Sequence, residues 1–236
     1  ATVVGVVLSD VVGDDLSVVA SGPTAPDEST YGEALSVLER YGVDPPPAVR
    51  KRLAAGARGD LRETPTEDDP AFDRVTNHVV ANGFTALSAA RDAARERGYD
   101  ACVLSSRIRG EAQEAAKTKA AVAEEASATG NPVPPPAVVL SGGETTVTVR
   151  GDGTGGPNLE YALSAALTLA LDGESAVVGA VDTDGRDGGT DVAGAIIDGE
   201  TVEDADAARD ALARNDALPF LRDRGAVLDT GATGTN

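Results

Sequence analysis

Three glycine-rich loops in the carboxy-terminal part of the chain combine acids with hydroxyl groups. They span 141–146 (SGGETT), 182–191 (DTDGRDGGTD) and 230–236 (TGATGTN). The first two adjoin an apolar run that is typical of a strand, and the third closely follows one. Glycine lets backbone N–H groups crowd around an anion, and threonine and serine add hydroxyl donors. Because open α/β sheets bind ligands beyond the carboxyl ends of their strands, the loops predict one polyanion site, with phosphate as the expected ligand.

The first loop and a further segment, 151–158 (GDGTGGPN), each allow two interpretations. The loop could cradle an oxyanion, or its two glycines could form a tight hairpin between strands. The segment opens a predicted helix, whose free N–H groups suit phosphate, or it is a flexible turn before a proline-started helix. It has neither a Walker A sequence nor a dinucleotide fingerprint. The candidate residues are Ser141, Gly142, Gly143, Glu144, Thr145, Gly155, Gly156 and Asn158.

Aspartates follow two of the predicted strands. Four of them lie within 182–191, and the segment 9–15 (SDVVGDD) follows the apolar run 3–8. Mg²⁺ is typically held by one or two carboxylates plus phosphate oxygens. The pattern at 182–191 therefore indicates a ligand or metal site. At 9–15 a metal or general-base role is one interpretation, and a surface turn is the other.

Apolar runs and helical spacings alternate along most of the chain. We expect strands at 3–8, 75–81, 100–104, 138–140, 145–149, 176–181 and 193–197, and helices at 30–41, 48–55, 85–97, 110–128, 157–170 and 204–214. The buried stripe of the helix from 157 should comprise Leu159, Leu163, Ala166, Leu167 and Ala170. The run 3–8 is continuously apolar, which is typical of a strand covered on both faces. This alternation predicts an α/β protein with mixed or mostly parallel sheets covered by helices.

Composition narrows the possible partners. The formal net charge of −19 argues against nucleic acid as a ligand, and there is no apolar run of transmembrane length. Three lysines and many acids are typical of a cytoplasmic protein from a salt-accumulating microbe, although an ordinary acidic protein is the alternative. The chain has no methionine, opens on an apolar run and closes within a loop. We therefore expect it to be a fragment of a longer protein.

Read together, several segments resemble the glycerate 2-kinase family, whose carboxy-terminal part is the MOFRL domain. They are 8–15, 20–24, 106–112, 140–147, 155–160, 183–194, 215–216 and 230–236. The resemblance covers nearly the whole chain. It implies a two-domain α/β enzyme with an interdomain active site. Residues 1–70 would be the end of a Rossmann-like first domain, and 71–236 a second α/β domain whose MOFRL segment, from about 137, is truncated.

The resemblance implies transfer of the ATP γ-phosphoryl group to D-glycerate with a divalent metal such as Mg²⁺, giving 2-phosphoglycerate. The alternatives are a hydroxypyruvate reductase and a non-catalytic domain that binds sugar acids or phosphate; a homo-oligomer is possible and no membrane partner is expected. The fragment alone should be inactive. Asp10, Asp184 and Asp187 would be catalytic, and Asp10, Asp14 and Asp184 would hold the metal. Thr183, Thr190, Thr233 and Asn236 would join the binding residues listed above.

The chain departs from the family pattern at three positions. The family usually has arginine where Pro157 stands, glutamine where Leu159 stands and often proline where Gly189 stands. The missing arginine is expected to stabilise the transferring phosphoryl group. Its substitute could be Arg107, Arg150 or Arg186, and the sequence leaves that choice open.

Overall fold

The computed structural model describes residues 1–173 and 175–234 and divides into two compact units, Ala1–Asn82 and Gly83–Asn236. The amino-terminal unit contains β1 (Val3–Ser9), the short 3-10 helices Val19–Ser21 and Pro70–Arg74, helices α1 (Tyr31–Arg40) and α2 (Pro47–Ala57), and β2 (Val75–Asn82). Strands β1 and β2 pair in parallel. Thr30 and Glu33 form a capping box that begins α1, and Pro47 at the first position begins α2.

Strand β1 is not covered on both faces within the described residues. Val4, Val6 and Leu8 are 62%, 71% and 53% exposed. The reason is that β1 and β2 form a two-stranded sheet by themselves. An apolar run correctly predicted the strand, but not the neighbours that would bury it.

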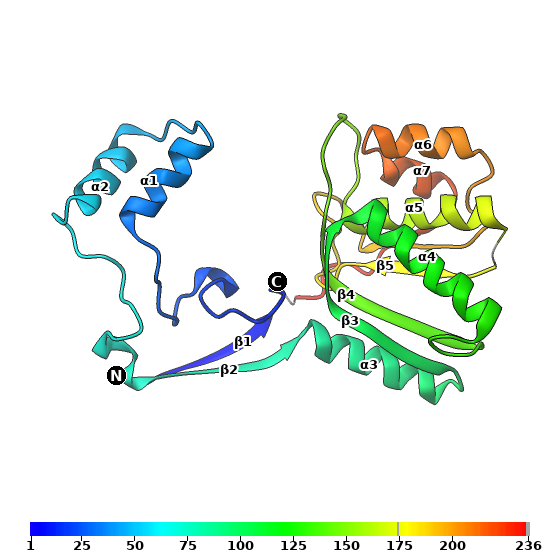
Figure 1. The fold of residues 1–236 in the computed structure, drawn as a ribbon, viewed down its shortest axis with the longest axis horizontal. Helices are drawn as coiled ribbons and strands as arrows, with labels where there is room; N and C mark the ends of the chain where they lie inside the picture. Colours follow the sequence, from blue (N-terminus) through cyan, green and yellow to red (C-terminus); the bar gives the residue numbers. More distant parts are fainter. Residues whose placement is uncertain (174, 235–236) are drawn as a thin grey trace. The chain divides into compact units, whose positions relative to one another are not determined.

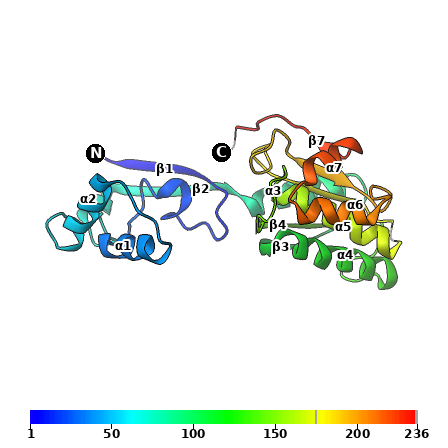
Figure 2. The same ribbon diagram turned by 90° about the horizontal axis from the view of Figure 1, so that it is seen from above.

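The main hydrophobic core lies in the carboxy-terminal unit, whose helices and strands can be followed in Figures 1 and 2. Its helices are α3 (Gly83–Glu96), α4 (Ala112–Thr129), α5 (Pro157–Asp172), α6 (Ala205–Ala213) and α7 (Ala217–Asp223). Its strands are β3 (Asp100–Glu111), β4 (Ala137–Thr146), β5 (Val178–Val181), β6 (Gly194–Ile197) and β7 (Val227–Leu228). Strands β3 and β4 are parallel, whereas β5, β6 and β7 form an antiparallel sheet. This mixed α/β architecture confirms the predicted fold class.

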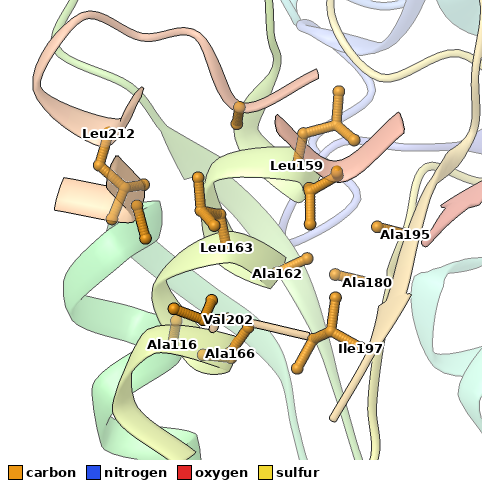
Figure 3. Close-up of a cluster of buried hydrophobic side chains, with 14 of the residues drawn as sticks. Ala116, Leu159, Ala162, Leu163, Ala166, Ala180, Ala195, Ile197, Val202 and Leu212 are labelled. Carbon is orange, nitrogen blue, oxygen red and sulfur yellow. The ribbon is translucent and has the colours of Figure 1, made fainter. Parts of the chain in front are cut away.

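Helix α5 is the centre of this core and packs against α4, β5, β6, α6 and α7. Leu159, Leu163 and Ala166 of the predicted stripe are fully buried, and Leu167 and Ala170 are partly buried against the same cluster (Figure 3). The core is built almost entirely from alanine, leucine, valine and isoleucine. Small side chains let the elements around α5 approach closely, so its amino-terminal end is held by packing on several sides.

The glycine pair at 142–143 is neither a loop nor a hairpin, because β4 continues through it alongside β3. The register between β3 and β4 shifts between Ser105 and Ile108 of β3, opposite the glycines of β4. Gly143 has a φ of 153°, and a Cβ placed there would lie 2.1 Å from the carbonyl oxygen of Ile108. Glycine is needed here because the irregular strand brings the two backbones unusually close.

Candidate functional site

The amino-terminal end of α5 is capped by a side chain from a distant loop. Gly156 at the N-cap has no side chain, and Pro157 at the first position has no N–H group. One carboxylate oxygen of Asp187 accepts hydrogen bonds from the Asn158 backbone N–H at 2.8 Å and the Asn158 amide at 3.1 Å. The other oxygen accepts from the Leu159 N–H at 2.8 Å. Asp187 thus satisfies the N–H groups that the sequence suggested for phosphate.

The fit between Asp187 and the helix is tight. Asp187 is 0% exposed, and a Cβ placed on Gly156 would lie 2.5 Å from the Asp187 carboxylate. Burial raises the pKa of Asp187, which outweighs the opposing effect of its hydrogen bonds to Asn158 and Leu159. Both oxygens of this side chain are therefore engaged in holding the start of α5.

The loop that carries Asp187 begins directly after β5 and is folded back on itself. The Asp187 N–H donates to the Val192 carbonyl at 2.7 Å, and the Thr190 hydroxyl donates to the Asp187 carbonyl at 2.8 Å. Thr190 is buried, and this internal bond supplies the partner that its hydroxyl needs there. The Arg186 N–H donates to Asp184 Oδ1 at 2.7 Å, which fixes the orientation of that half-buried carboxylate.

The segment after β7 lies against this loop. The Thr233 hydroxyl donates to the Thr183 carbonyl at 2.7 Å, and the Thr233 N–H donates to the Asp184 carbonyl at 2.9 Å. Gly185 has a φ of 89°, and a Cβ there would lie 2.1 Å from the carbonyl oxygen of Gly231. Two of the three predicted loops are therefore in direct contact. Asn236 lies outside the described residues.

The acids of this loop are close enough to influence one another. Burial, followed by the negative charge of Asp184, raises the pKa of Asp182, and Asp187 adds a smaller contribution. No group of three or more His, Cys, Asp or Glu side chains in the described ranges is placed to hold a metal ion. Neighbouring carboxylates nevertheless suit Mg²⁺, which needs only one or two of them beside phosphate oxygens.

Replacing Asp182 by asparagine should stabilise the carboxy-terminal unit at pH 7. A carboxyl group whose folded-state pKa is raised binds its proton more tightly in the folded state, so its ionisation at neutral pH opposes folding. The gain should shrink as the pH falls through the raised pKa and should vanish below the ordinary value of 3.8, where the carboxyl is protonated in both states. Urea unfolding of both proteins between pH 7 and pH 4 measures it. A gain that does not change with pH would contradict this explanation.

The remaining predicted residues lie elsewhere. Residues 141–145 lie on β4, where Ser141 and Glu144 face Ser105 and Arg109 in the strand register. Asp10 and Asp14 belong to the amino-terminal unit. There Asp10 is exposed, and Asp14 accepts a hydrogen bond from the Asn82 amide at 2.8 Å. The structure thus brings together the loops 151–158, 182–191 and 230–234 within one unit.

Sequence reasoning assigned no role to the residues that hold the segment 150–156, although 215–216 and 155–160 are among the segments that carry the resemblance. Asn215 and Asp216, at the junction of α6 and α7, accept hydrogen bonds from backbone N–H groups of this segment. Glu160, which is 2% exposed, accepts one from the Asn215 amide. A usable signal was present, because Glu160 is a charged residue adjacent to the apolar stripe of α5 in the sequence.

Comparison with known proteins assigns the chain to a family. Residues 137–236 match the model of the MOFRL family, and residues 1–54 match a domain of unknown function, DUF4147. The "Glycerate kinase" of Macaca fascicularis is 31% identical over the whole chain, which covers 70% of that protein. The "D-glycerate 2-kinase" of Thermotoga maritima is 40% identical over the whole chain. This chain belongs to the glycerate 2-kinase family.

Two further relatives show how much of a full-length protein this chain of the glycerate 2-kinase family matches. A crystal structure of glycerate kinase from Thermotoga maritima matches with a TM-score of 0.82 and 40% identity, covering 100% of this chain and 55% of that one. A "Putative hydroxypyruvate reductase" of Agrobacterium vitis is 38% identical, and the chain covers 53% of it. The chain thus spans about half the length of most of these relatives. Among the described helices, none has the length and apolar character needed to cross a bilayer.

Proposed function

We propose that the full-length protein carrying this chain is an ATP-dependent D-glycerate 2-kinase that forms 2-phosphoglycerate. The observation that carries the proposal is the convergence of the loops 151–158, 182–191 and 230–234, with Asp184, Thr183 and Thr233 in contact, in a chain of this family. Phosphoryl transfer depends mainly on positioning and on neutralising charge. A unit that orders acids, glycine N–H groups and hydroxyls in neighbouring loops suits those demands.

Within this function, Asp184 would contact the metal or the glycerate hydroxyl. Its side chain is held by the Arg186 N–H but is not fully buried, so it remains accessible to a ligand. Mg²⁺, when bound with ATP, would neutralise the phosphate charge, and Asp184 would be a ligand of it. Asp187 has both oxygens engaged at α5, so we assign it a positioning role. The metal or base roles of Asp10 and Asp14 stay predictions for the other unit.

The glycine N–H groups of 155–156 and the side chain of Asn158 would hold phosphate or carboxylate oxygens. Thr183, Thr190 and Thr233 would order the neighbouring loops, since the hydroxyls of Thr190 and Thr233 already donate to backbone carbonyls there. The residues 141–145 of β4 would contact substrate through Ser141, Glu144 and Thr145. Arg186 is our candidate for the missing family arginine, because it lies between Asp184 and Asp187 in the chain and is exposed.

The decisive assay compares two reactions of the purified full-length protein. ATP-dependent phosphorylation of D-glycerate, with the product identified by ³¹P NMR, should proceed and give the 2-phosphate. The alternative, hydroxypyruvate reduction, draws support from the name of the Agrobacterium relative and predicts oxidation of NADH instead. Pro157, in place of arginine, favours a third outcome, in which glycerate binds without turnover. Either of the last two results would overturn the proposal.

We also propose that the protein works in a salt-rich cytoplasm. The formal charge of −19 and the small number of lysines imply strong mutual repulsion among surface acids, which salt screens. The midpoint of thermal unfolding should therefore rise as KCl is increased from 0.1 M to about 2 M, where the screening length falls to a few ångströms. A midpoint that is insensitive to KCl would contradict this assignment.

A further inference from the structure

Asn215 has a left-handed backbone conformation, and its side-chain amide makes every hydrogen bond that it can. It is 8% exposed and has a φ of 56°, in the left-handed region that few residues other than glycine and asparagine adopt readily. Its Oδ1 accepts from the Arg150 N–H at 2.7 Å and the Gly151 N–H at 3.0 Å. Its Nδ2 donates to the Thr148 carbonyl at 3.3 Å and to Glu160 Oε1 at 2.6 Å. The side chain therefore makes all four of its possible hydrogen bonds.

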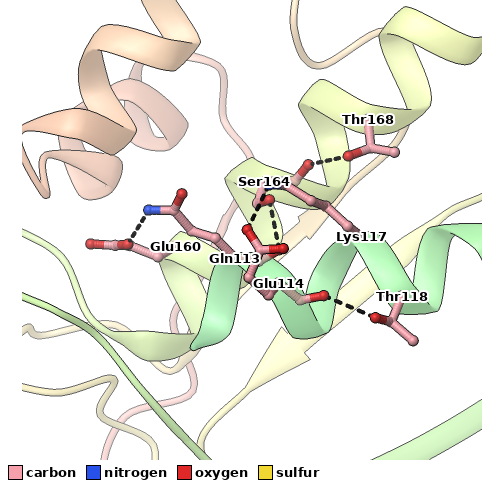
Figure 4. Close-up of polar contacts among 7 residues, drawn as sticks. All are labelled: Gln113, Glu114, Lys117, Thr118, Glu160, Ser164 and Thr168. Carbon is pink, nitrogen blue, oxygen red and sulfur yellow. Dashed lines mark hydrogen bonds and ion pairs between the residues drawn. The ribbon is translucent and has the colours of Figure 1, made fainter. Parts of the chain in front are cut away.

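Glu160 reinforces the orientation of this amide, which the Arg150 and Gly151 N–H groups and the Thr148 carbonyl also require. A carboxylate can only accept hydrogen bonds, so it must face the NH₂ group of Asn215 and not the oxygen. Its other oxygen accepts from the Gln113 amide of α4 at 2.8 Å (Figure 4). The backbone of Gln113 is also held, because its main-chain carbonyl accepts from the Ser164 hydroxyl at 3.1 Å. With the NH₂ group turned to Glu160, the Asn215 oxygen is left facing the two backbone N–H groups.

The rest of the segment follows the α6–α7 junction closely. The Gly153 N–H donates to the Arg214 carbonyl at 3.0 Å, and the Thr154 N–H donates to Asp216 Oδ1 at 2.9 Å. A Cβ on Gly151 would lie 2.3 Å from the carbonyl oxygen of Arg214. Hydrogen bonds to the α6–α7 junction therefore hold residues 148–154 at several points along the segment. The two glycines at 155–156 follow directly and lead into α5.

We propose that Asn215 is a positioning residue for the binding of the ATP phosphates, acting through the segment 150–156, and that Glu160 holds its amide in place from the opposite side. The proposal rests on the function proposed above. Binding an anion with backbone N–H groups requires that they already point to one place, since ordering a glycine-rich segment costs conformational entropy. Asn215 removes that cost before the ligand arrives.

Asn215→Gly in the full-length protein tests the proposal, because glycine keeps the left-handed backbone without strain and removes only the amide. Hydrogen exchange of the Arg150 and Gly151 N–H groups should accelerate by roughly tenfold or more, as expected when they lose a hydrogen-bond acceptor. The KM for ATP should rise by roughly tenfold while kcat changes less. The change in KM separates a positioning role from one that only stabilises the fold.

Glu160→Gln is the second variant, and Glu114→Gln on α4 is its matched control. Glutamine loses the charge and one of the two acceptor oxygens that now receive the Asn215 and Gln113 amides, so the Asn215 amide is held less firmly. Exchange of the same two N–H groups should therefore accelerate in Glu160→Gln. Glu114 is exposed and pairs with Lys117, so Glu114→Gln should match the unchanged protein (Figure 4).

The exchange rates and the KM for ATP together either support or overturn the proposal. Unchanged exchange in Asn215→Gly and Glu160→Gln would overturn it. So would faster exchange with an unchanged KM for ATP, because the segment would then be ordered without serving the nucleotide. If the unchanged protein phosphorylates no glycerate, the proposed function fails instead. In that event ATP titrations of the unchanged and Asn215→Gly proteins by calorimetry replace KM, and equal dissociation constants, or binding by neither protein, would overturn the positioning role.

Discussion

Asp187→Ala is expected to destabilise the carboxy-terminal unit by about 3 kcal/mol. The Asn158 and Leu159 N–H groups at the start of α5 would lose their acceptor, and Gly156 and Pro157 offer no replacement. The Asp187 side chain is fully buried, so water cannot readily take its place. Because α5 is central to the core, the loss should appear in the global free energy of unfolding, measured by urea denaturation at pH 7.

Two further variants define the origin of this loss. Asp187→Asn keeps one acceptor oxygen and should cost less than Asp187→Ala, although its NH₂ group would face one of the helix N–H groups. Asp172→Asn, an exposed aspartate at the other end of α5, is the control for removing a charge and should change the free energy by less than about 0.5 kcal/mol. If Asp187→Ala were no more harmful than this control, Asp187 would not be the cap that α5 requires.

Asp184→Asn should reduce turnover of the full-length protein by about 10²- to 10³-fold, the usual cost of removing one electrostatic contact to a transition state. Asparagine can keep an acceptor oxygen for the Arg186 N–H, which Asp184 Oδ1 now accepts at 2.7 Å, while it removes the charge and replaces the other oxygen with an NH₂ group. The loop should therefore keep its conformation while its contact with the metal or the glycerate hydroxyl weakens. Steady-state kinetics with ATP and D-glycerate measure the effect, with Asp172→Asn as the charge control.

The unfolding midpoint of Asp184→Asn decides how its kinetics are interpreted. A midpoint close to that of the unchanged protein, combined with low turnover, supports a direct role in phosphoryl transfer. Near-normal turnover would remove Asp184 from the catalytic residues. A large loss of stability would place Asp184 with Asp187, as a residue whose contribution is to hold the loop after β5.

Much of the fold could be predicted because its local patterns agree with the tertiary structure. The spacing of Leu159, Leu163 and Ala166 predicted α5, and these residues are fully buried. Pro157 correctly indicated its first position. Helix α7 was not predicted, since its short sequence carries too few turns for a periodic pattern to emerge and includes Pro219. The strand at 137–146 was divided in error, because glycine pairs usually signal turns.

The order of amino acids specifies which residue types are available: glycines where backbones must approach, acids and hydroxyls after apolar runs, and an alternation of strands and helices. How these residues are used depends on contacts that form when the chain folds. Asp187 and Asn158 are 29 positions apart, and Asn215 and Arg150 are 65 apart. Whether a carboxylate meets a ligand or a helix end depends on contacts across such separations, which follow from packing around α5 and not from local periodicity. That is why Asp187 looked like a catalytic acid in the sequence and serves as a helix cap in the fold.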